Sequence, residues 1–235
     1  MYKGIYIALS GALLKQRQLD VSAQNIANAA TSGYKKERIS FRNSLIPVDN
    51  RPPYAPDGRS MSDVSAVVTD FSAGAMMKTG NPLDLAINGE GFFALEGNTY
   101  TRNGNFRIDG EGYLVTQDGR RVLGSGGPVS VQGGRIDVSA SGEIFVDGVS
   151  VGTLRIVDFP DKNVLEKRSG GVFYTRAAGS EINTQVSQGY LEASNVEAVR
   201  EMVQMMASLR EFEAYQKMII AFDEASSKTV NQMGK

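Results

Sequence analysis

The 235-residue chain has no cysteine and no histidine. The absence of cysteine excludes disulfide bonds and thiolate chemistry. The absence of histidine removes the commonest general base and the commonest protein ligand for metal ions. These two absences leave few of the side chains from which catalytic and metal sites are usually built, and we expect the protein to use no metal and no cofactor.

Blocks of like charge and long hydrophobic runs are also missing from the sequence. The chain has 25 basic and 26 acidic residues, a net charge of −1, which does not favour binding to nucleic acid or to an anionic membrane. No stretch approaches the roughly 18 uninterrupted apolar residues that suggest a membrane span. Residues 1–14 lack the basic start, apolar run and cleavage site of a secretory signal. We therefore expect no membrane span and no cleavable signal, in a protein that is either cytosolic or exported by a machine that reads no such signal.

A long helical pattern fills the C-terminal stretch 190–233. Ser194, followed three residues later by Glu197, matches the capping box that starts helices. A helix of about 37 residues would be roughly 55 Å long, which is too long for a compact domain of this size. Polar residues interrupt its apolar face, and this favours a seam for a helical partner over a buried core. The C-terminal seam consists of Val199, Met202, Met206, Leu209, Phe212, Ile219, Phe222 and Val230.

A matching pattern lies at the other end of the chain, where apolar residues alternate steps of four and three with one polar place at Gln16. Two ordinary core helices would also show such stripes. The position of both helices at the extreme ends of the chain favours a terminal coiled-coil pair instead. The N-terminal seam consists of Ile5, Leu9, Ala12, Leu19 and Ile26.

The region between the helices has a different character. The first helix is predicted to end near Asn28, because the turn-forming residues up to Gly33 follow it and glycine accepts a positive φ. Four prolines between Pro47 and Pro56 then predict a semi-rigid linker. An extended segment is expected before this linker, from Tyr34 to Phe41, and another after it, from Ser62 to Phe71.

From Asn81 to about Thr184, short apolar runs alternate with Asn-Gly, Asp-Gly and Ser-Gly pairs. Such pairs favour the tight turns of β-hairpins, and their spacing is typical of an all-β sandwich or barrel. The predicted fold class is α+β, with long terminal helices that pair as a coiled coil and a central hairpin-rich β domain. The predicted parts are a helical domain (1–33 and 190–235), an extended strap (34–80) and the β domain (81–189). The runs expected to form strands are 91–95, 113–116, 135–138, 143–146 and 153–159.

No catalytic constellation stands out. The Asp-Gly pairs lack the spaced oxygen ligands of a calcium loop, and turn chemistry accounts for them. The glycine-rich segment 124–127 is not followed by Lys-Ser/Thr or a helix start, as a phosphate-binding loop would be. A carboxylate pair for glycoside hydrolysis stays open, because the separation of such a pair is spatial. Residues 100–106 mix aromatic and basic side chains as single-strand binders do, but the neutral net charge argues against that function.

Three stretches carry a signature: LDVSAQNIANAATSGYK at 19–35, TGNPLDLAINGEGFF at 79–93 with YTRNGNF at 100–106, and GYLEASNVE at 189–197. They resemble the bacterial flagellar axial proteins, the family of rod, hook and hook-associated subunits. Ser32 stands where the family usually has proline, and Gln24 stands where asparagine is common. The motif residues are Asn25, Asn28, Thr31, Gly33, Tyr34, Asn81, Pro82, Leu83, Asp84, Gly89, Gly91, Phe92, Phe93, Tyr100, Arg102, Gly189, Leu191, Ser194, Asn195 and Val196.

The resemblance implies a structural subunit of the flagellar rod, the drive shaft that transmits torque from the motor to the hook, and not an enzyme. The segment Phe71–Ala75 and the ending Phe222–Lys228 look more like the proximal than the distal rod subunit. The implied partners are copies of the chain, other rod subunits and the flagellar type III export apparatus, and the implied place is the periplasmic part of the basal body. The rival interpretation is a freestanding enzyme or ligand-binding β domain with accessory helices.

Overall fold

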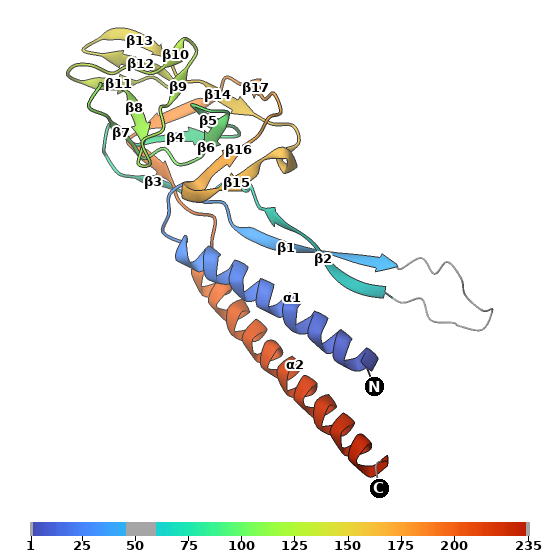
Figure 1. The fold of residues 1–235 in the computed structure, drawn as a ribbon. Helices are drawn as coiled ribbons and strands as arrows, with labels where there is room; N and C mark the ends of the chain where they lie inside the picture. Colours follow the sequence, from blue (N-terminus) through green and yellow to red (C-terminus); the bar gives the residue numbers. More distant parts are fainter. Residues whose placement is uncertain (1, 46–59, 234–235) are drawn as a thin grey trace. The chain divides into compact units, whose positions relative to one another are not determined.

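The computed structural model describes residues 2–45 and 60–233 (Figure 1). Helix α1 (Tyr2–Ala27) and helix α2 (Ala198–Met233) lie at the two ends of the chain, and the strands lie between them. The order of elements and the α+β class are therefore as predicted. The proline-rich linker predicted at 47–58 falls outside the described residues.

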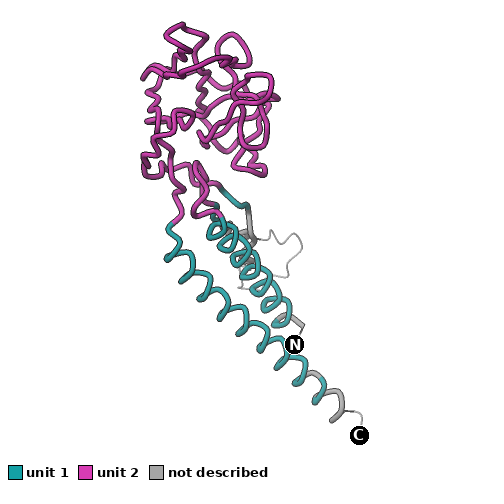
Figure 2. Tube along the Cα trace, turned by 90° about the vertical axis from the view of Figure 1, so that its left-hand side faces the viewer, with its two compact units in different colours: residues 1–27, 37–68, 197–235 teal, residues 28–36, 69–196 magenta. Residues whose placement is uncertain are grey.

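The chain divides into two compact units (Figure 2). Unit 1 contains residues 1–27, 37–68 and 197–235, and unit 2 contains residues 28–36 and 69–196. The chain therefore passes between the units at four places: 27/28, 36/37, 68/69 and 196/197. These boundaries differ from those suggested by the sequence, because unit 2 includes both the turn after α1 and the segment before α2.

In unit 1, α1 and α2 run antiparallel and lie side by side in both views (Figures 1 and 2). A β-hairpin accompanies them, formed by β1 (Glu37–Leu45) and β2 (Ser60–Thr69, whose last residue the division assigns to unit 2). Helix α1 ends one residue before Asn28, close to the predicted end. Both strands overlap the segments that were expected to be extended, but β1 continues to Leu45 and β2 begins at Ser60.

Helix α2 begins at Ala198, so the capping box predicted at Ser194 and Glu197 is wrong. The Ser194 hydroxyl instead accepts a hydrogen bond from the Val196 N–H at 3.3 Å. Residues 190–192 form strand β19, which pairs with β3 (Met76–Lys78), and the side chain of Asn195 binds backbone groups of unit 2. These tertiary hydrogen bonds hold the segment extended, and they outweigh a local helix-start signal.

All pairings in unit 2 are antiparallel. The largest sheet has six strands in the order β15-β16-β6-β5-β14-β17. Every run expected to form a strand contains one. The remaining strands are β4 (Leu85–Asn88), β5 (Phe92–Leu95), β6 (Thr99–Thr101), β7 (Phe106–Ile108), β8 (Leu114–Thr116), β9 (Leu123–Gly124), β10 (Gly127–Pro128), β11 (Ile136–Val138), β12 (Glu143–Val146), β13 (Val149–Thr153), β14 (Ile156–Asp158), β15 (Glu166–Arg168), β16 (Val172–Tyr174), β17 (Ser180–Glu181) and β18 (Gln185–Gln188).

The turn between β12 and β13 shows why the dipeptide pattern predicted hairpins. Asp147 and Gly148 both have positive φ, 51° and 82°, as a two-residue type I′ turn requires. Two apolar clusters form the core of unit 2, one around Phe93 and one around Phe92. Adjacent residues of β5 thus point into different clusters, which follows from the alternation of side chains along a strand.

Candidate functional site: the helix pair and the Glu192 network

Helix α1 contacts α2 through its small residues. A methyl group added at Gly4 would lie 2.7 Å from the ring of Phe222, and one added at Gly11 would lie 2.6 Å from the ring of Tyr215. Lys15 and Glu211 form an ion pair further along the same face. Because glycine has no side chain, the two helices can approach closely enough for each ring to cover a glycine. The contacting positions 4, 11 and 15 continue, at steps of three, four or seven residues along one helix face, to the buried Ser22 and Asn25.

The predicted N-terminal seam is only partly on this face. Ala12 is buried, Ile5, Leu19 and Ile26 are half-buried, and Leu9 is exposed. Ala8, which is not a member of the predicted seam, is fully buried.

The predicted C-terminal seam is half-buried in its later part and exposed in its earlier part. Phe212, Ile219 and Phe222 are half-buried, and Phe222 covers Gly4. The earlier half of the seam is exposed, with Val199 at 76% and three further members at about one half: Met202, Met206 and Leu209. Ser208, which was not predicted, is 2% exposed and lies on the half-buried face with Phe212 and Tyr215. The side chain of Val230 is outside the described side chains.

The turn after α1 belongs to unit 2. Thr31 donates its hydroxyl to Asn28 Oδ1 at 3.3 Å, and the Tyr34 N–H donates to the Thr31 carbonyl. Gly33 has φ +67°, as the sequence suggested, and its N–H donates to the Glu192 carbonyl at 2.7 Å. A Cβ at Gly33 would lie 2.4 Å from the backbone nitrogen of Asn103. The glycine is therefore required both for its conformation and for its close contact with the middle motif.

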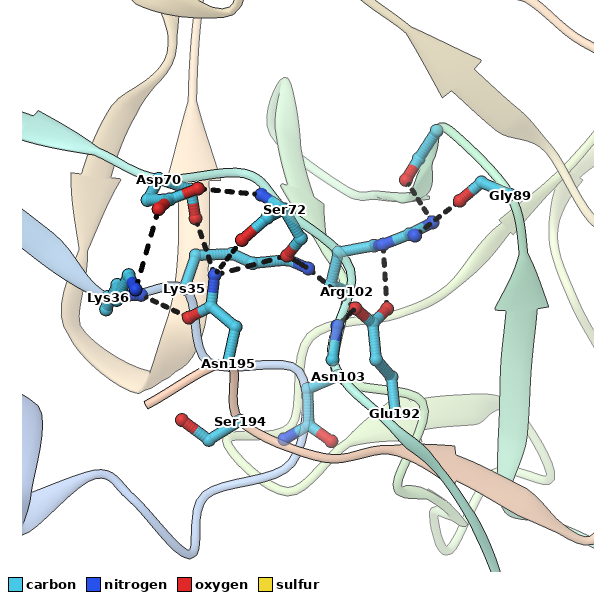
Figure 3. A network of polar contacts seen from close by, with 12 residues as sticks. Lys35, Lys36, Asp70, Ser72, Gly89, Arg102, Asn103, Glu192, Ser194 and Asn195 are labelled. Carbon is cyan, nitrogen blue, oxygen red and sulfur yellow. Dashed lines mark hydrogen bonds and ion pairs between the residues drawn. The ribbon is translucent and has the colours of Figure 1, made fainter. Parts of the chain in front are cut away.

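Three signature stretches meet at a buried carboxylate, Glu192 (Figure 3). Lys35 Nζ lies 2.6 Å from Glu192 Oε1, and Arg102 Nε lies 3.0 Å from Glu192 Oε2. The side chains of all three are at most 6% exposed. We call the set of Lys35, Lys36, Asp70, Ser72, Arg102, Glu192 and Asn195 the Glu192 network.

Backbone carbonyls complete the surroundings of the two buried cations. Lys35 Nζ also donates to the Ser72 carbonyl at 2.8 Å, and Arg102 donates to the carbonyls of Gly89 and Gly91 (Figure 3). Burial lowers the pKa of Lys35, while the hydrogen bond and the charge of Glu192 oppose that shift. Burial likewise lowers the pKa of Arg102, against the attraction of Glu192. Both cations therefore depend on the same carboxylate.

Two motif asparagines bind backbone groups beside the places where the chain changes unit. Asn195 accepts from the Lys36 N–H at 2.7 Å and donates to the carbonyls of Asp70 and Ser72 at 2.9 and 3.1 Å. Within unit 1, Asn25 accepts from the Glu37 N–H at 2.9 Å and donates to the Glu37 carbonyl at 2.8 Å. An amide side chain has both a donor and an acceptor, so it can hold a backbone segment as a neighbouring strand would.

The middle motif builds turns and core rather than a reactive site. Asn81 accepts from the Leu83 N–H, and buried Asp84 accepts from the side chains of Asn81 and Asn105. The carbonyl of Pro82 accepts from Gln188 at 2.9 Å. Gly91 has φ +108°, and its missing Cβ would lie 2.8 Å from Ile156. Phe92 and Phe93 enter the two core clusters, and Tyr100 packs edge-on against Phe159.

The last motif forms the end of unit 2. Gly189 has φ +76°, and its carbonyl accepts from the N–H groups of Thr79 and Gly80. Leu191 is buried, whereas Ser194 and Val196 are half-buried in the extended segment before α2. Lys35 and Glu192 lie within the signature stretches, but the sequence alone did not indicate a role for either residue. Lys167, whose ammonium lies 3.8 Å from the Tyr34 ring centre and donates to the Lys35 carbonyl, had no sequence signal.

The described part of the chain offers no group of three or more carboxylates that could hold a metal ion. Among its described residues, no helix is both long enough and apolar enough to cross a membrane.

Comparisons with known proteins agree with these three segments. Residues 5–35 match the family "Flagella basal body rod protein", residues 86–146 match "Flagellar hook protein FlgE/F/G D1 domain", and residues 187–233 match "Flagellar basal body rod FlgEFG protein C-terminal". The chain is 34% identical to the basal-body rod protein FlgF of Caulobacter vibrioides over 100% of this chain and 99% of the relative. It is 31% identical to FlgF of Escherichia coli (99% and 98%) and 30% identical to FlgG of Bacillus subtilis (98% and 99%).

The chain belongs to the family of bacterial flagellar basal-body rod proteins. It is a structural subunit of the rod and is FlgF-like, with FlgG a close alternative. None of the relatives named here favours the rival interpretation, a freestanding enzyme or ligand-binding domain.

Proposed function

We propose that the chain polymerises through the outer faces of its terminal helices, which contact copies of the chain and other rod subunits in a helical assembly. The predicted seams then act together with the pairing of α1 and α2 as a coiled coil. In this assembly the subunit would transmit torque from motor to hook, as a scaffold and not as an enzyme. It would reach the periplasmic part of the basal body through the flagellar type III export apparatus.

The observation that supports this proposal is the number of large apolar side chains exposed on the helix pair. On α2, Val203 and Ile220 are each 58% exposed, in addition to the exposed members of the predicted seam. On α1, Ile7 is 67% exposed, and Tyr6 and Leu13 are also more than half exposed. Contiguous apolar surface of this kind is unusual on a monomer and is typical of an interaction surface.

The placement of the exposed residues explains why one helix partner is not enough. Each residue turns the helix by about 100°, so Val199 and Met206 lie nearly opposite the buried Ser208, and Met202 and Leu209 lie on the flank between the two faces. Helix α1 covers only the half-buried face. The uncovered face needs a different surface, and a head-to-tail contact between different faces is the kind that builds filaments.

The substitution Leu209→Asp tests the proposal. It places a carboxylate where apolar side chains of neighbouring subunits are expected, and burying an unpaired charge costs on the order of several kcal/mol. We expect a soluble chain with its β structure intact that is exported but absent from isolated basal bodies, so that the cells do not swim. Circular dichroism of the purified chain and its recovery in basal bodies are the two measurements.

Ala214→Asp is the matched control. Ala214 is also exposed on α2, five residues from Leu209 and thus about 140° away around the helix. The control introduces the same charge and a similar loss of helix propensity but removes only a methyl group of apolar surface, so it should be recovered in basal bodies better than Leu209→Asp. Normal recovery of Leu209→Asp in basal bodies would refute the proposed contact, and loss of β structure would indicate that α2 belongs to a shared core.

A further inference from the structure

We propose that the Glu192 network is the mechanical clamp of the subunit, which makes the chain segments that link its two units move as one body under torque. This inference rests on the proposed function, because it assigns to particular residues the load that a rod subunit carries.

The topology supplies the first step of the argument. The chain passes between the units at 27/28, 36/37, 68/69 and 196/197. Whatever else joins the units, these four peptide segments are the covalent routes by which force passes from one to the other. If these segments could shift separately within unit 2, a torque on the helices would first displace the segments relative to one another. Only then would it rotate the β structure.

Within unit 2, the network binds these segments to one another. The Asp70 N–H donates to the Lys36 carbonyl at 2.8 Å, which joins the segments at 36/37 and 68/69. Asn195 binds Lys36, Asp70 and Ser72, which adds the segment at 196/197 (Figure 3). The segment that starts at 27/28 runs into Gly33, whose N–H donates to the Glu192 carbonyl at 2.7 Å.

The buried ions anchor this bundle of segments to the sheet. Glu192 contacts Lys35 from the N-terminal segment and Arg102, which directly follows β6 in the largest sheet. Glu192 Oε1 also accepts from the Gly74 N–H at 2.8 Å. An ion pair whose side chains are 1% and 2% exposed cannot exchange partners with water or salt without opening the fold. Such a contact suits a joint that must hold its geometry under load.

Arrangement of the charges makes the clamp cooperative. Lys35 and Arg102 are both cationic and both next to Glu192, and each charge disfavours the other. Docking of the N-terminal segment beside Arg102 is therefore more favourable once the C-terminal segment has brought in its carboxylate, which contacts both cations. The clamp closes when both ends of the chain are in place.

The primary test is Asn195→Ala, because it removes hydrogen bonds between the segments without burying an unpaired charge. Amide exchange of the purified chain should be at least about tenfold faster at Lys36 and Asp70, with the amides of β5 and β6 unchanged. Basal bodies should contain the variant in normal amount, and cells should swim normally in dilute buffer. As the viscosity of the medium rises, their rotation should fail earlier than in the parent strain.

Asn183→Ala, an exposed asparagine in the loop before β18, is the matched control and should behave as the parent at every viscosity. Glu192→Gln keeps the size of the side chain and removes its charge. If this variant folds, its rotation should depend on load even more strongly. If it does not fold, Asn195→Ala decides alone.

The clamp is refuted if Asn195→Ala leaves amide exchange at Lys36 unchanged or leaves rotation under high load normal. Equal loss of rotation at all loads, or absence of the folded variant from basal bodies, would also overturn it, since either result means that the network serves folding or assembly. The proposed polymer contact is tested separately. It predicts that Leu209→Asp is missing from basal bodies at any load, and normal recovery of that variant would refute the contact without bearing on the clamp.

Discussion

At the scale of single residues, the signature stretches act through backbone geometry and buried polar contacts. Asn25, Asn195 and Gly33 each hold or approach a backbone segment distant in sequence. Glu192 adds a buried charge shared by two cations. Removing one partner of a buried ion pair typically costs about 3–5 kcal/mol, because the remaining charge is left without a partner. Gly33, Glu192 and Asn195 therefore stabilise unit 2, and Asn25 holds Glu37 within unit 1.

Gly33→Ala tests the close contact at this scale. A non-glycine residue with positive φ costs about 1–2 kcal/mol, and the added Cβ would also collide with the Asn103 backbone. We expect the melting temperature of unit 2, followed by circular dichroism in the β region, to fall by several degrees.

Gly80→Ala is the control for this prediction. Gly80 has a similar φ, +76°, but a Cβ there would meet nothing within 4 Å. The control carries the conformational cost alone, so Gly33→Ala should be clearly the more destabilising of the two. Equal effects would mean that the contact with Asn103 relaxes freely. From the sequence, Gly33 was predicted only to end the first helix. Its contact with the backbone of Asn103 has no local signal and could not be predicted.

At the scale of secondary structure, the pairing of α1 with α2 depends on rings that cover glycines. Gly11→Ala should raise the intrinsic helix propensity of α1 by up to about 1 kcal/mol, yet its methyl group would lie 2.6 Å from the Tyr215 ring. We expect the helices to be pushed apart and recovery of the chain in basal bodies to fall.

A second substitution separates these two effects. Tyr215→Ala in the same chain makes room for the methyl group, so the double variant should be recovered better than Gly11→Ala alone. Ser10→Ala, at an exposed position next to Gly11, should assemble normally. If Tyr215→Ala gives no rescue, the ring does not set the distance between the helices.

The same elements show how far the sequence could predict the structure. The hairpin dipeptides predicted the strands of unit 2, because glycine can adopt the positive φ of a tight turn without steric cost, as at Asp147–Gly148. The predicted N-terminal seam contains the buried Ala12 but not Gly4 and Gly11, which lie against the rings of Phe222 and Tyr215. Large side chains such as Leu9 and Val199 are exposed in the single chain. Hydrophobic periodicity does not reveal which of two partners a stripe will contact.

The start of α2 and the Glu192 network were missed for a related reason. Ser194 and Glu197 satisfy a local helix rule, but Asn195 between them binds residues more than 120 positions away. Likewise, Lys35, Arg102 and Glu192 are ordinary charged residues in separate stretches, and only the fold brings them together. Contacts of this range have no periodic signature in one sequence.

At the scale of the whole molecule, the two units differ in how much of their stability comes from the single chain. Unit 2 has its own buried apolar clusters and a buried polar network around Glu192. Unit 1 leaves many of its large apolar side chains exposed. Ordering a residue costs about 1–2 kcal/mol of backbone entropy, and a helix with one partner recovers only part of that through burial. Under the proposed function, the helices gain the rest of their stability from neighbouring subunits.

This difference predicts how the free subunit behaves. In purified monomer, amides of α2 from Val199 onward should exchange rapidly, while amides of β5, β6 and β16 in the same sample stay protected. After assembly the α2 amides should become protected as well, because neighbouring subunits cover the exposed face. Hydrogen exchange read by mass spectrometry on monomer and on isolated basal bodies makes the comparison, with sedimentation to verify the monomer. Strong protection of α2 in a verified monomer would show that α1 alone stabilises it, and the exposed stripe would then not be needed for folding the helices.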